Sequence, residues 1–338
     1  MTLSIWKIKE EKFPQKGKLE AKIKFLLNYA ILAPSGHNSQ PWKFKIEDNT
    51  LSVYADLTRE RKGVDPNNRE LYISVGCAIA NIEVAAKHFG LIWEEEWWPK
   101  AVEPTLVVVY KFVEGKKVWG QKKELLKAIS QRSTFREKFE PKKLKVSDKQ
   151  KLMKSGRGDG AEIVWTNNSN KEKLADLIER AQKIWFRSRK LTEELELWIR
   201  KDLHGLGADK KKRDIINLSN FSNGLKDFLS HDFADIDRRA GRDKQWALEA
   251  PVLGVLVTTK DHRRAWVEAG VLYQKVALEA VGLGIQIGFF NSVAELPKKR
   301  AELALLLKKN WWPQLVLRAG YAKSAPHSPR RVVEEVLV

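Results

Sequence analysis

Apolar residues recur at helical spacing over several long stretches of the chain. Residues 18–33, 71–89 and 263–281 each carry an apolar stripe at intervals of three and four residues, which predicts amphipathic or buried helices. Residues 122–129 show the same spacing among lysines. Residues 170–244 are strongly charged and mostly helical in pattern, so we expect them to form an inserted layer or lid.

Other segments have the alternating or continuous apolar patterns that are typical of strands. The strands expected from these patterns span residues 42–47, 51–55, 105–112, 161–165, 252–259 and 315–321. The first two are joined by a turn at Asp48-Asn49. The runs at 105–112 and 252–259 are rich in β-branched residues, which predicts strands that are covered on both faces.

The order of helices and strands in the first part of the chain is repeated in the second part. When the helix at 71–89 is aligned with the helix at 263–281, Gly76 falls on Gly270 at a shift of 194 residues. Each of these helices also lies next to a β-branched strand. This similarity suggests two copies of one unit.

A second alignment, at a shift of 126 residues, compares the segments that precede these helices. It places Arg132 opposite Trp6 and Arg136 opposite Glu10, so only the second copy carries the arginines. The string Pro-Ser-Gly-His-Asn at 34–38 occurs only in the first copy. If the chain holds two fused copies, their ligand-binding groups are complementary.

Composition limits the classes of protein to which the chain can belong. Its 338 residues, 43% of them hydrophobic, are enough for a sizeable core, and no apolar run is long enough to cross a bilayer. Because Glu10 and Glu11 lie where a secretion signal would need an apolar core, we expect a soluble cytoplasmic protein. The single cysteine, Cys77, excludes an intrachain disulfide, and the histidines lack metal-ligand spacing, so no metal site is expected.

The net charge of +19 is compatible with nucleic acid, an acidic surface or phosphate-bearing small molecules as partners. The basic residues are spread along the chain and alternate with acidic stretches, and no zinc-finger, basic-zipper or RNA-binding pattern occurs. We therefore expect a solvated basic surface, no nucleic acid partner and no membrane.

The stretch at 33–42, Ala-Pro-Ser-Gly-His-Asn-Ser-Gln-Pro-Trp, joins the first predicted helix to the first predicted strand. Pro34 is expected to end the helix, and Ser35, Gly36 and Asn38 place short polar groups beside exposed backbone amides. Such a loop can hold a flat polar ligand, although an ordinary turn is the alternative. His37 is expected to be solvated and is assigned no acid or base role.

Several of these strings together resemble the nitroreductase family. Residues 33–42 are similar to its flavin loop, Arg-Ser-Thr-Phe-Arg at 132–136 to its phosphate motif, and Ser-Pro-Arg-Arg at 328–331 to its C-terminal basic motif. Asp-Pro-Asn-Asn-Arg-Glu at 65–70, with Arg-Ala-Gly-Tyr at 318–321, resembles the Acg-type branch of that family. Without the family context, Arg132 and Arg136 are equally compatible with a solvated helical face.

The resemblance implies an α+β, nitroreductase-like fold in which two fused halves mimic a homodimer. Each half is expected to be a mainly antiparallel sheet packed by helices, with residues 1–125 forming the first half and residues 126–338 the second. The helical lid at about 170–244 would be inserted into the second half. The chain would be a monomer, because it already contains both halves.

The resemblance also implies one FMN per chain, bound between the halves, and a mirror-related site that is empty because Trp6 and Glu10 replace its arginines. No side chain is assigned a catalytic role. The residues expected to bind FMN are Pro34, Ser35, Gly36, Asn38, Gln40, Arg132, Ser133, Arg136, Phe290, Arg330 and Arg331.

Two functions follow from this resemblance. In the first, the protein transfers hydride from NAD(P)H through FMN to a small-molecule acceptor such as a nitroaromatic or a quinone. In the second, it binds or sequesters FMN under a lid and has little reductase activity. The charged region at 170–244 is the sequence feature that favours the second function.

Overall fold

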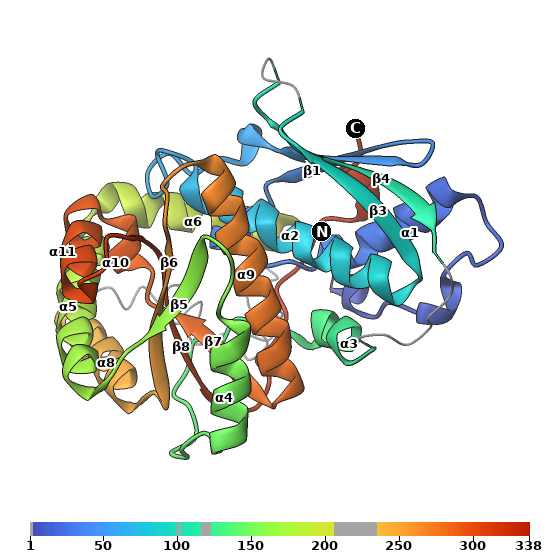
Figure 1. Cartoon of the computed structure of the whole chain (residues 1–338). Coiled ribbons are helices and arrows are strands. Elements are labelled where there is room, and N and C mark those ends of the chain that lie inside the picture. The colour runs from blue at the N-terminus through green and yellow to red at the C-terminus, as the bar shows by residue number, and fades with distance from the viewer. Residues whose placement is uncertain (1–2, 100–102, 116–122, 206–234) are drawn as a thin grey trace.

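The structure contains two four-stranded antiparallel sheets, one in each part of the chain (Figure 1). It is a computed structural model that describes residues 3–99, 103–115, 123–205 and 235–338. The first sheet has the order β1-β2-β4-β3 and the second has the order β5-β6-β8-β7, so corresponding strands occupy corresponding places. The strands are β1 (Trp42–Glu47), β2 (Thr50–Ala55), β3 (Leu91–Trp97), β4 (Leu106–Glu114), β5 (Ala161–Trp165), β6 (Val252–Thr258), β7 (Ile285–Phe289) and β8 (Trp312–Tyr321).

Helices separate and cover the two sheets. They are α1 (Leu19–Ala30), α2 (Arg69–His88), α3 (Lys123–Gln131), α4 (Val146–Ser155), α5 (Asn168–Arg187), α6 (Arg189–Gly205), α8 (Ile236–Glu249), α9 (Arg263–Gly282), α10 (Ser292–Glu295) and α11 (Pro297–Leu307). Antiparallel sheets with helices packed on them confirm the predicted α+β class.

Helices α2 and α9 cross at the centre of the molecule and join its two halves (Figure 1). At the crossing, Gly76 of α2 faces the backbone of Val267, and Gly270 of α9 faces the backbone of Ile73. A Cβ atom at either glycine would overlap the facing carbonyl oxygen, so only glycine allows this approach. The two contacts are related by the same shift of 194 residues that aligns the helices in sequence, so the crossing is pseudo-symmetric.

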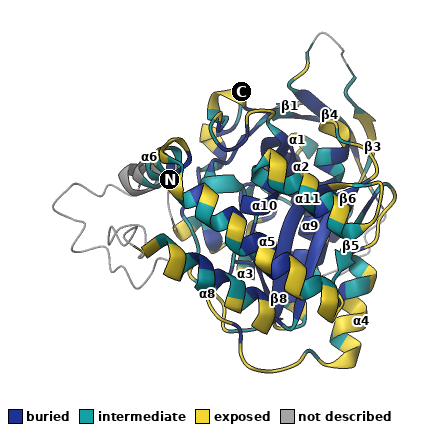
Figure 2. Cartoon of the chain, turned by 90° about the vertical axis from the view of Figure 1, so that its left-hand side faces the viewer, coloured by how far each residue is buried: buried dark blue, intermediate teal, exposed yellow. Residues whose placement is uncertain are grey.

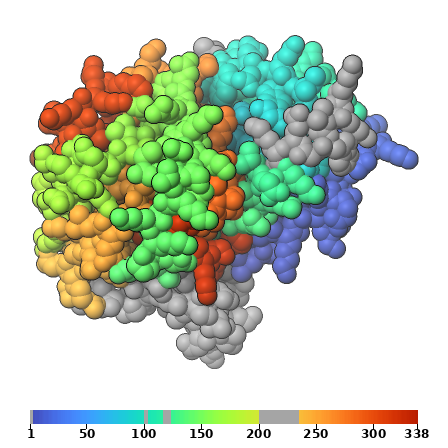
Figure 3. All heavy atoms as spheres, turned by 60° about the horizontal axis from the view of Figure 1, so that its bottom comes forward, coloured from blue at the N-terminus to red at the C-terminus, as the bar shows by residue number. Residues whose placement is uncertain are grey.

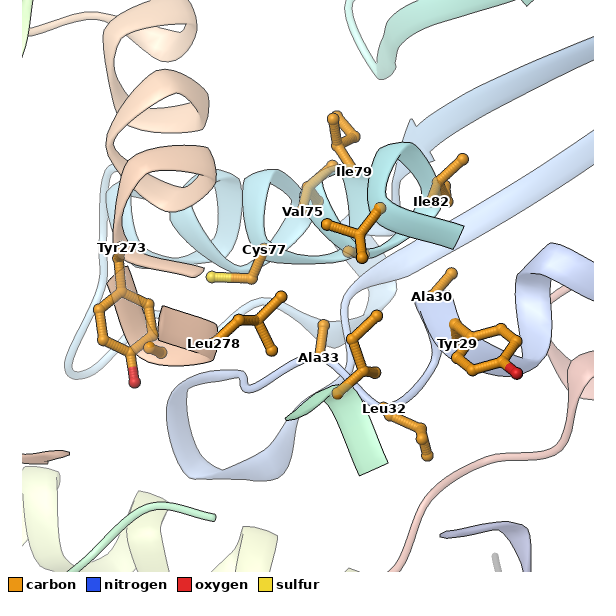
Figure 4. Packing of buried hydrophobic residues seen from close by; sticks show 14 of the residues in the cluster. Tyr29, Ala30, Leu32, Ala33, Val75, Cys77, Ile79, Ile82, Tyr273 and Leu278 are labelled. Atoms are coloured by element: carbon orange, nitrogen blue, oxygen red, sulfur yellow. The ribbon is translucent and has the colours of Figure 1, made fainter. Parts of the chain in front are cut away.

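Polar groups also cross between the halves. The Gln274 side-chain amide donates to Asn81 Oδ1 over 2.7 Å, and the Asn81 amide donates to the carbonyl oxygen of Tyr29 over 2.9 Å. The Cys77 thiol donates to the carbonyl oxygen of Gly270. Figure 4 shows Cys77 on α2 directed toward the side of Tyr273, in the same apolar cluster. These buried hydrogen bonds fix the two halves relative to one another.

The second sheet is covered on both faces. Along β6, Val252 and Leu256 pack into the central cluster with α9, whereas Leu253, Val255 and Val257 pack under α5 and α8 on the opposite face. Figure 2 shows these outer helices exposed on one side and buried on the side that meets the sheet. The prediction that residues 252–259 form a doubly covered strand is confirmed.

The first sheet is covered mainly on the face that meets α1 and α2. In β4, residues 106–108 are buried, but from Val109 onward buried residues alternate with accessible ones, and Lys111 and Val113 are exposed. The expectation that 105–112 is covered on both faces is therefore wrong. The outer helical layer of the second sheet is formed by residues after 165, and within the described residues no such layer covers the first sheet.

The charged region at 170–244 divides into two parts. Helices α5 and α8 belong to the outer layer of the second half, because Leu174, Ile178 and Ala247 pack against the sheet. Helix α6 instead reaches the first half, where the Glu194 carboxylate accepts hydrogen bonds from the backbone amides of Gly63 and Val64 at 3.1 and 2.9 Å. Residues 206–234 of the expected lid lie outside the described residues.

The residues after β8 return to the first half. Phe44 of β1 donates its amide to the carbonyl oxygen of Val336 over 2.8 Å and accepts a hydrogen bond from the amide of Val338 over 2.9 Å. Trp6 donates its indole N–H to the carbonyl oxygen of Ser328 over 2.9 Å. The two parts of the chain therefore share a broad boundary, which the space-filling view shows from another side (Figure 3).

We expect Gly76→Ala and Gly270→Ala each to lower the free energy of unfolding by about 1–3 kcal/mol or more, because the added methyl group forces the helices apart. Urea denaturation measures this change. Gly241→Ala in α8 is the matched control: nothing lies within 4 Å of the added Cβ, so stability should stay equal or rise by up to about 1 kcal/mol. Equal stability of Gly76→Ala and wild type would contradict the close crossing.

Candidate functional site

A cavity of about 200 Å³ lies where the two halves meet. The first half contributes Pro34, Ser35, Gly36, His37, Arg61, Glu70, Ile73, Ser74 and Cys77, and the second half contributes Thr134, Arg136, Tyr273, Phe289, Asn291, Glu295 and Leu315. Ile73, Phe289 and Leu315 provide apolar surface, while the arginines, carboxyls and loop amides provide polar groups. A cavity with this mixture suits a flat ligand that has polar edges.

The loop at 34–40 forms one wall of the cavity and has an unusual backbone. His37, Asn38 and Gln40 adopt left-handed conformations, with φ of 50°, 55° and 51°. The loop conformation is stabilised by Ser35, whose hydroxyl accepts a hydrogen bond from the Gln40 backbone amide over 2.9 Å. Such strained conformations cluster at ligand sites. Helix α1 ends at Ala30 rather than at Pro34, so the junction is longer than predicted.

Gly36 brings this loop against a buried arginine. A Cβ atom at Gly36 would overlap the guanidinium of Arg61, whose side chain is only 2% exposed. Arg61 donates from Nη2 to Glu70 Oε2 over 2.8 Å. Burial opposes the charge on Arg61, but Glu70 and Asp65 outweigh this effect and raise its pKa. Its Nη1 is buried and has no hydrogen-bond partner among the described residues.

A smaller recess of about 40 Å³ adjoins the cavity and shares Pro34, Ser35, Thr134 and Arg136 with it. It is lined by Arg132, Ser133 and Arg330, among others. Arg330 donates to Asn38 Oδ1 over 2.6 Å, which links the C-terminal basic motif to the loop. The recess therefore collects groups from four separate parts of the chain, at residue 6 and within 34–38, 132–136 and 326–330.

Arg132 is buried without a carboxylate partner. Its side chain is 3% exposed, no carboxylate of the described residues lies within ion-pair distance, and its Nε has no hydrogen-bond partner there. Desolvation by burial lowers its pKa. An uncompensated buried guanidinium is costly unless an anion binds to it. The recess therefore has the character of an anion site.

Arg136 lies between the cavity and the recess and lines both. Its side chain is exposed to the open space of these hollows, yet enough protein surrounds it that desolvation, followed by the nearby Arg132, lowers its pKa. The positive charges of two neighbouring arginines repel each other, and one multivalent anion bound between them would stabilise both charges.

Two relatives match this chain along nearly its whole length. The acg protein of Mycobacterium tuberculosis, whose name assigns it to the NAD(P)H nitroreductases, is 26% identical over 326 residues, covering 93% of this chain and 94% of the relative. An uncharacterized protein of the same organism is 24% identical over 332 residues, covering 91% of this chain and 90% of the relative. The chain is thus similar along nearly its whole length to a protein that is named as a nitroreductase of the Acg type. The family resemblance predicted from the sequence motifs is thereby confirmed.

One solved structure that is similar to this chain is the FMN-dependent nitroreductase NfnB from Mycobacterium smegmatis in complex with NADPH. The similarity covers 63% of this chain and 96% of NfnB, with 16% identity and a TM-score of 0.42. No family model matches the chain.

Most of the residues that we predicted for the site line the two hollows. Those in the cavity or the recess are Pro34, Ser35, Gly36, Asn38, Arg132, Ser133, Arg136 and Arg330. Three predicted residues, Gln40, Phe290 and Arg331, line neither hollow.

These three residues are buried elsewhere for clear reasons. Gln40 is fully buried, and its Oε1 accepts a hydrogen bond from the amide of Arg331 over 2.8 Å, so this pair ties the tail to the loop. The Arg331 side chain lies 3.8 Å from Asp56. Phe290 packs into the outer cluster of the second half, whereas its neighbour Phe289 lines the cavity.

The structure also changes the role of Trp6. The alignment at 126 residues places Trp6 at the mirror-related site, in place of an arginine, whereas in the structure Trp6 lines the same recess as Arg132. Its ring stacks on His327 with 3.9 Å between the ring centroids and lies 4.9 Å from the Arg330 guanidinium carbon. The N-terminal segment therefore packs onto the C-terminal tail.

Several residues of the cavity were not predicted from the sequence. His37 is not solvated: it lines the cavity, and its ring lies edge-on to Trp185 at 6.4 Å. Burial, and then Arg61 and Arg136, lower its pKa, so it is neutral at physiological pH. Arg61 and Glu295 also line the cavity, and no motif in the sequence marks them.

The described part of the chain contains neither a cluster of metal ligands nor a helix that could span a membrane. Within the described residues, no group of three or more His, Cys, Asp or Glu side chains could hold a metal ion. None of the helices described is both long enough and apolar enough to cross a membrane.

We expect His327 to make the protein sensitive to acid. Burial, and then Arg132, lower its pKa to about 4, so between pH 6.5 and 4 the unfolded chain binds a proton that the folded protein does not, and stability falls as the pH falls. His327→Gln should reduce the loss of unfolding free energy between about pH 7 and 5 by about 1 kcal/mol, since the ring is only half enclosed. An equal loss in variant and wild type, measured by urea denaturation, would refute this assignment.

Proposed function

We propose that this protein is an FMN-dependent oxidoreductase that takes hydride from NAD(P)H and reduces a small acceptor such as a nitroaromatic or a quinone. The observation that carries this proposal is the pairing of two hollows: a cavity with apolar and polar groups, and an adjoining recess with Arg132, which is buried and has no carboxylate partner among the described residues. Relatives named as NAD(P)H nitroreductases support the same function.

The residues present fit FMN. A flavin phosphate carries nearly two negative charges, and Arg132, Ser133, Arg136 and Arg330 offer the donors that such a group needs in the recess. The loop at 34–36, with Ile73, Phe289 and Leu315, would hold the ring system in the cavity. We propose one FMN per chain, held by this recess and the adjoining cavity, in a monomer whose halves, residues 1–125 and 126–338, each contain one of the two sheets.

Bound FMN would supply the hydride chemistry, and the chain would control what reaches it. Tyr273 and Cys77 present neutral groups to the cavity, because burial raises the pKa of Tyr273 and raises that of Cys77 to about 12. Neutral His37 and the buried Arg61 supply hydrogen-bond donors on the first-half wall. The walls would thus bind and orient the reactants and keep part of the water away from them.

A second candidate function is FMN binding with little turnover. Its support is the contact of α5 and α6 with the first half: Trp185 lies against His37, and Glu194 holds the amides of Gly63 and Val64. A cover in this position would restrict the entry of NAD(P)H. The two candidates share the same cofactor site and differ only in access.

Anaerobic titration separates the two candidates. We expect the purified protein to be yellow, with one FMN per chain, and NADH or NADPH to bleach the flavin absorbance. The second candidate, a protein that sequesters FMN, would be favoured if dithionite reduced the bound FMN but neither NADH nor NADPH did. A colourless protein that also fails to bind added FMN would contradict both functions.

Replacement of the two arginines tests the position of the phosphate. Arg132→Ala with Arg136→Ala should weaken FMN binding by about 100-fold or more, because each lost charged hydrogen bond costs about 1.5–3 kcal/mol. Fluorescence titration of the apoprotein measures the dissociation constant. Arg180→Ala, on the outer face of α5, removes one exposed positive charge and should leave binding unchanged. Undiminished binding in the double variant would show that the phosphate lies elsewhere.

A further inference from the structure

Glu295 brings a carboxyl group to the cavity from the second half. It is the last residue of α10 and lines the cavity together with the loop at 34–37, which belongs to the first half. Its Oε2 accepts a hydrogen bond from the indole N–H of Trp185 over 2.6 Å. This bond fixes one oxygen of the carboxyl group and leaves Oε1 to carry a proton.

Glu295 has no cation of its own. The neighbouring guanidiniums of Arg61 and Arg69 both bond to Glu70, at 2.8 and 3.2 Å. Among the described residues, no lysine, arginine or histidine nitrogen lies within ion-pair distance of the Glu295 carboxyl. A carboxyl group that is enclosed by protein and lacks a counter-ion holds its proton.

The surrounding charges act in the same direction overall. Burial, followed by the negative charge of Glu70, raises the pKa of Glu295 to about 8, although Arg61, the Trp185 hydrogen bond and Arg69 oppose the rise. Asp65, 3.9 Å from Arg61, also draws on that guanidinium. At neutral pH, Glu295 is therefore mostly a neutral acid.

We propose that Glu295 is a catalytic acid, which donates its proton to the oxygen of the acceptor as that acceptor is reduced in the cavity. This proposal rests on the proposed function. Reduction of a quinone to a hydroquinone adds one hydride, with both electrons, and one proton. The hydride comes from the reduced cofactor, the O–H bond of Glu295 breaks, and a new O–H bond forms on the acceptor. Glu295 is left as a carboxylate and regains a proton from water.

Arg61 is suited to stabilise the charge that this step leaves behind. Its Nη1 is buried, lines the cavity region and has no hydrogen-bond partner among the described residues, while Nη2 is held by Glu70. A guanidinium with one bonded and one available nitrogen can stabilise a second, transient carboxylate. Glu295 thus combines a neutral resting state with a nearby group that tolerates its ionised state.

Cys77, Tyr273, His37 and Arg136 also face this cavity, but none of them changes its charge around pH 8. Burial raises the pKa of Cys77 to about 12 and also raises that of Tyr273, while burial and two arginines lower that of His37. Arg136 has a lowered pKa but, as a guanidinium, keeps its charge in this range. Loss of acceptor reduction as the pH rises through about 8 would therefore report Glu295.

The first test concerns the proton and needs no turnover. Difference infrared spectroscopy of the protein, between about pH 6.5 and 9.5, should show a protonated carboxyl band that disappears at high pH. Glu295→Gln should lose this band and keep the hydrogen bond from Trp185. Glu268→Gln, an exposed carboxylate on α9, is the control and should keep it. Absence of the band in wild type, or its persistence in Glu295→Gln, would overturn the proposal.

The second test separates proton donation from a structural effect. FMN-loaded protein is reduced with dithionite and mixed with either a quinone or ferricyanide, a one-electron oxidant that takes up no proton. Glu295→Gln should slow reoxidation by the quinone about 100-fold or more and leave reoxidation by ferricyanide unchanged. Equal quinone rates, or equal slowing with both oxidants, would overturn the role of Glu295. Failure of the wild type to bind FMN would refute the proposed function instead, and the infrared result would still decide the protonation.

Discussion

The close crossing of α2 and α9 is the constraint on which the rest of the structure depends. Because Gly76 and Gly270 carry no side chains, two long helices touch at their backbones, and each half then packs its own sheet against its own helix. The polar bonds from Gln274 to Asn81 and onward to Tyr29 fix the angle and register of this contact. The cavity and the recess lie beside this crossing, so their geometry follows from it.

The sequence predicted the parts of the fold that repeat a strong local pattern. The stripes at 71–89 and 263–281 correspond to α2 (Arg69–His88) and α9 (Arg263–Gly282), and their shared spacing already identified the two glycines that meet. Strands β3 and β7 were missed, because Leu91–Trp97 is mostly charged and aromatic and Ile285–Phe289 is short. Helix α4 (Val146–Ser155) was also missed, since only one of its residues, Leu152, is buried.

The site shows a similar division between motif residues and residues that only the fold brings near. Residues in compact strings, such as Ser35 and Arg132, line the hollows. Phe289 and Phe290 lie on opposite faces, because successive side chains at a strand end point in opposite directions, and the sequence alone does not show which of the two faces the cavity. Arg61 and Glu295 lie in unremarkable sequence, and their importance comes from burial and from neighbours distant in the chain, which no single-sequence pattern encodes.

The path of the tail after β8 has a consequence for the order of assembly during synthesis. The loop at 34–40 leaves the ribosome early, but its conformation is held by Arg330 through Asn38 and by the Arg331 amide through Gln40. The ligand wall of the first half therefore becomes rigid only after the last residues of the chain have been made. We expect the chain to gain the ability to bind its ligand abruptly, when the residues around 330 leave the ribosome and fix the loop at 34–40.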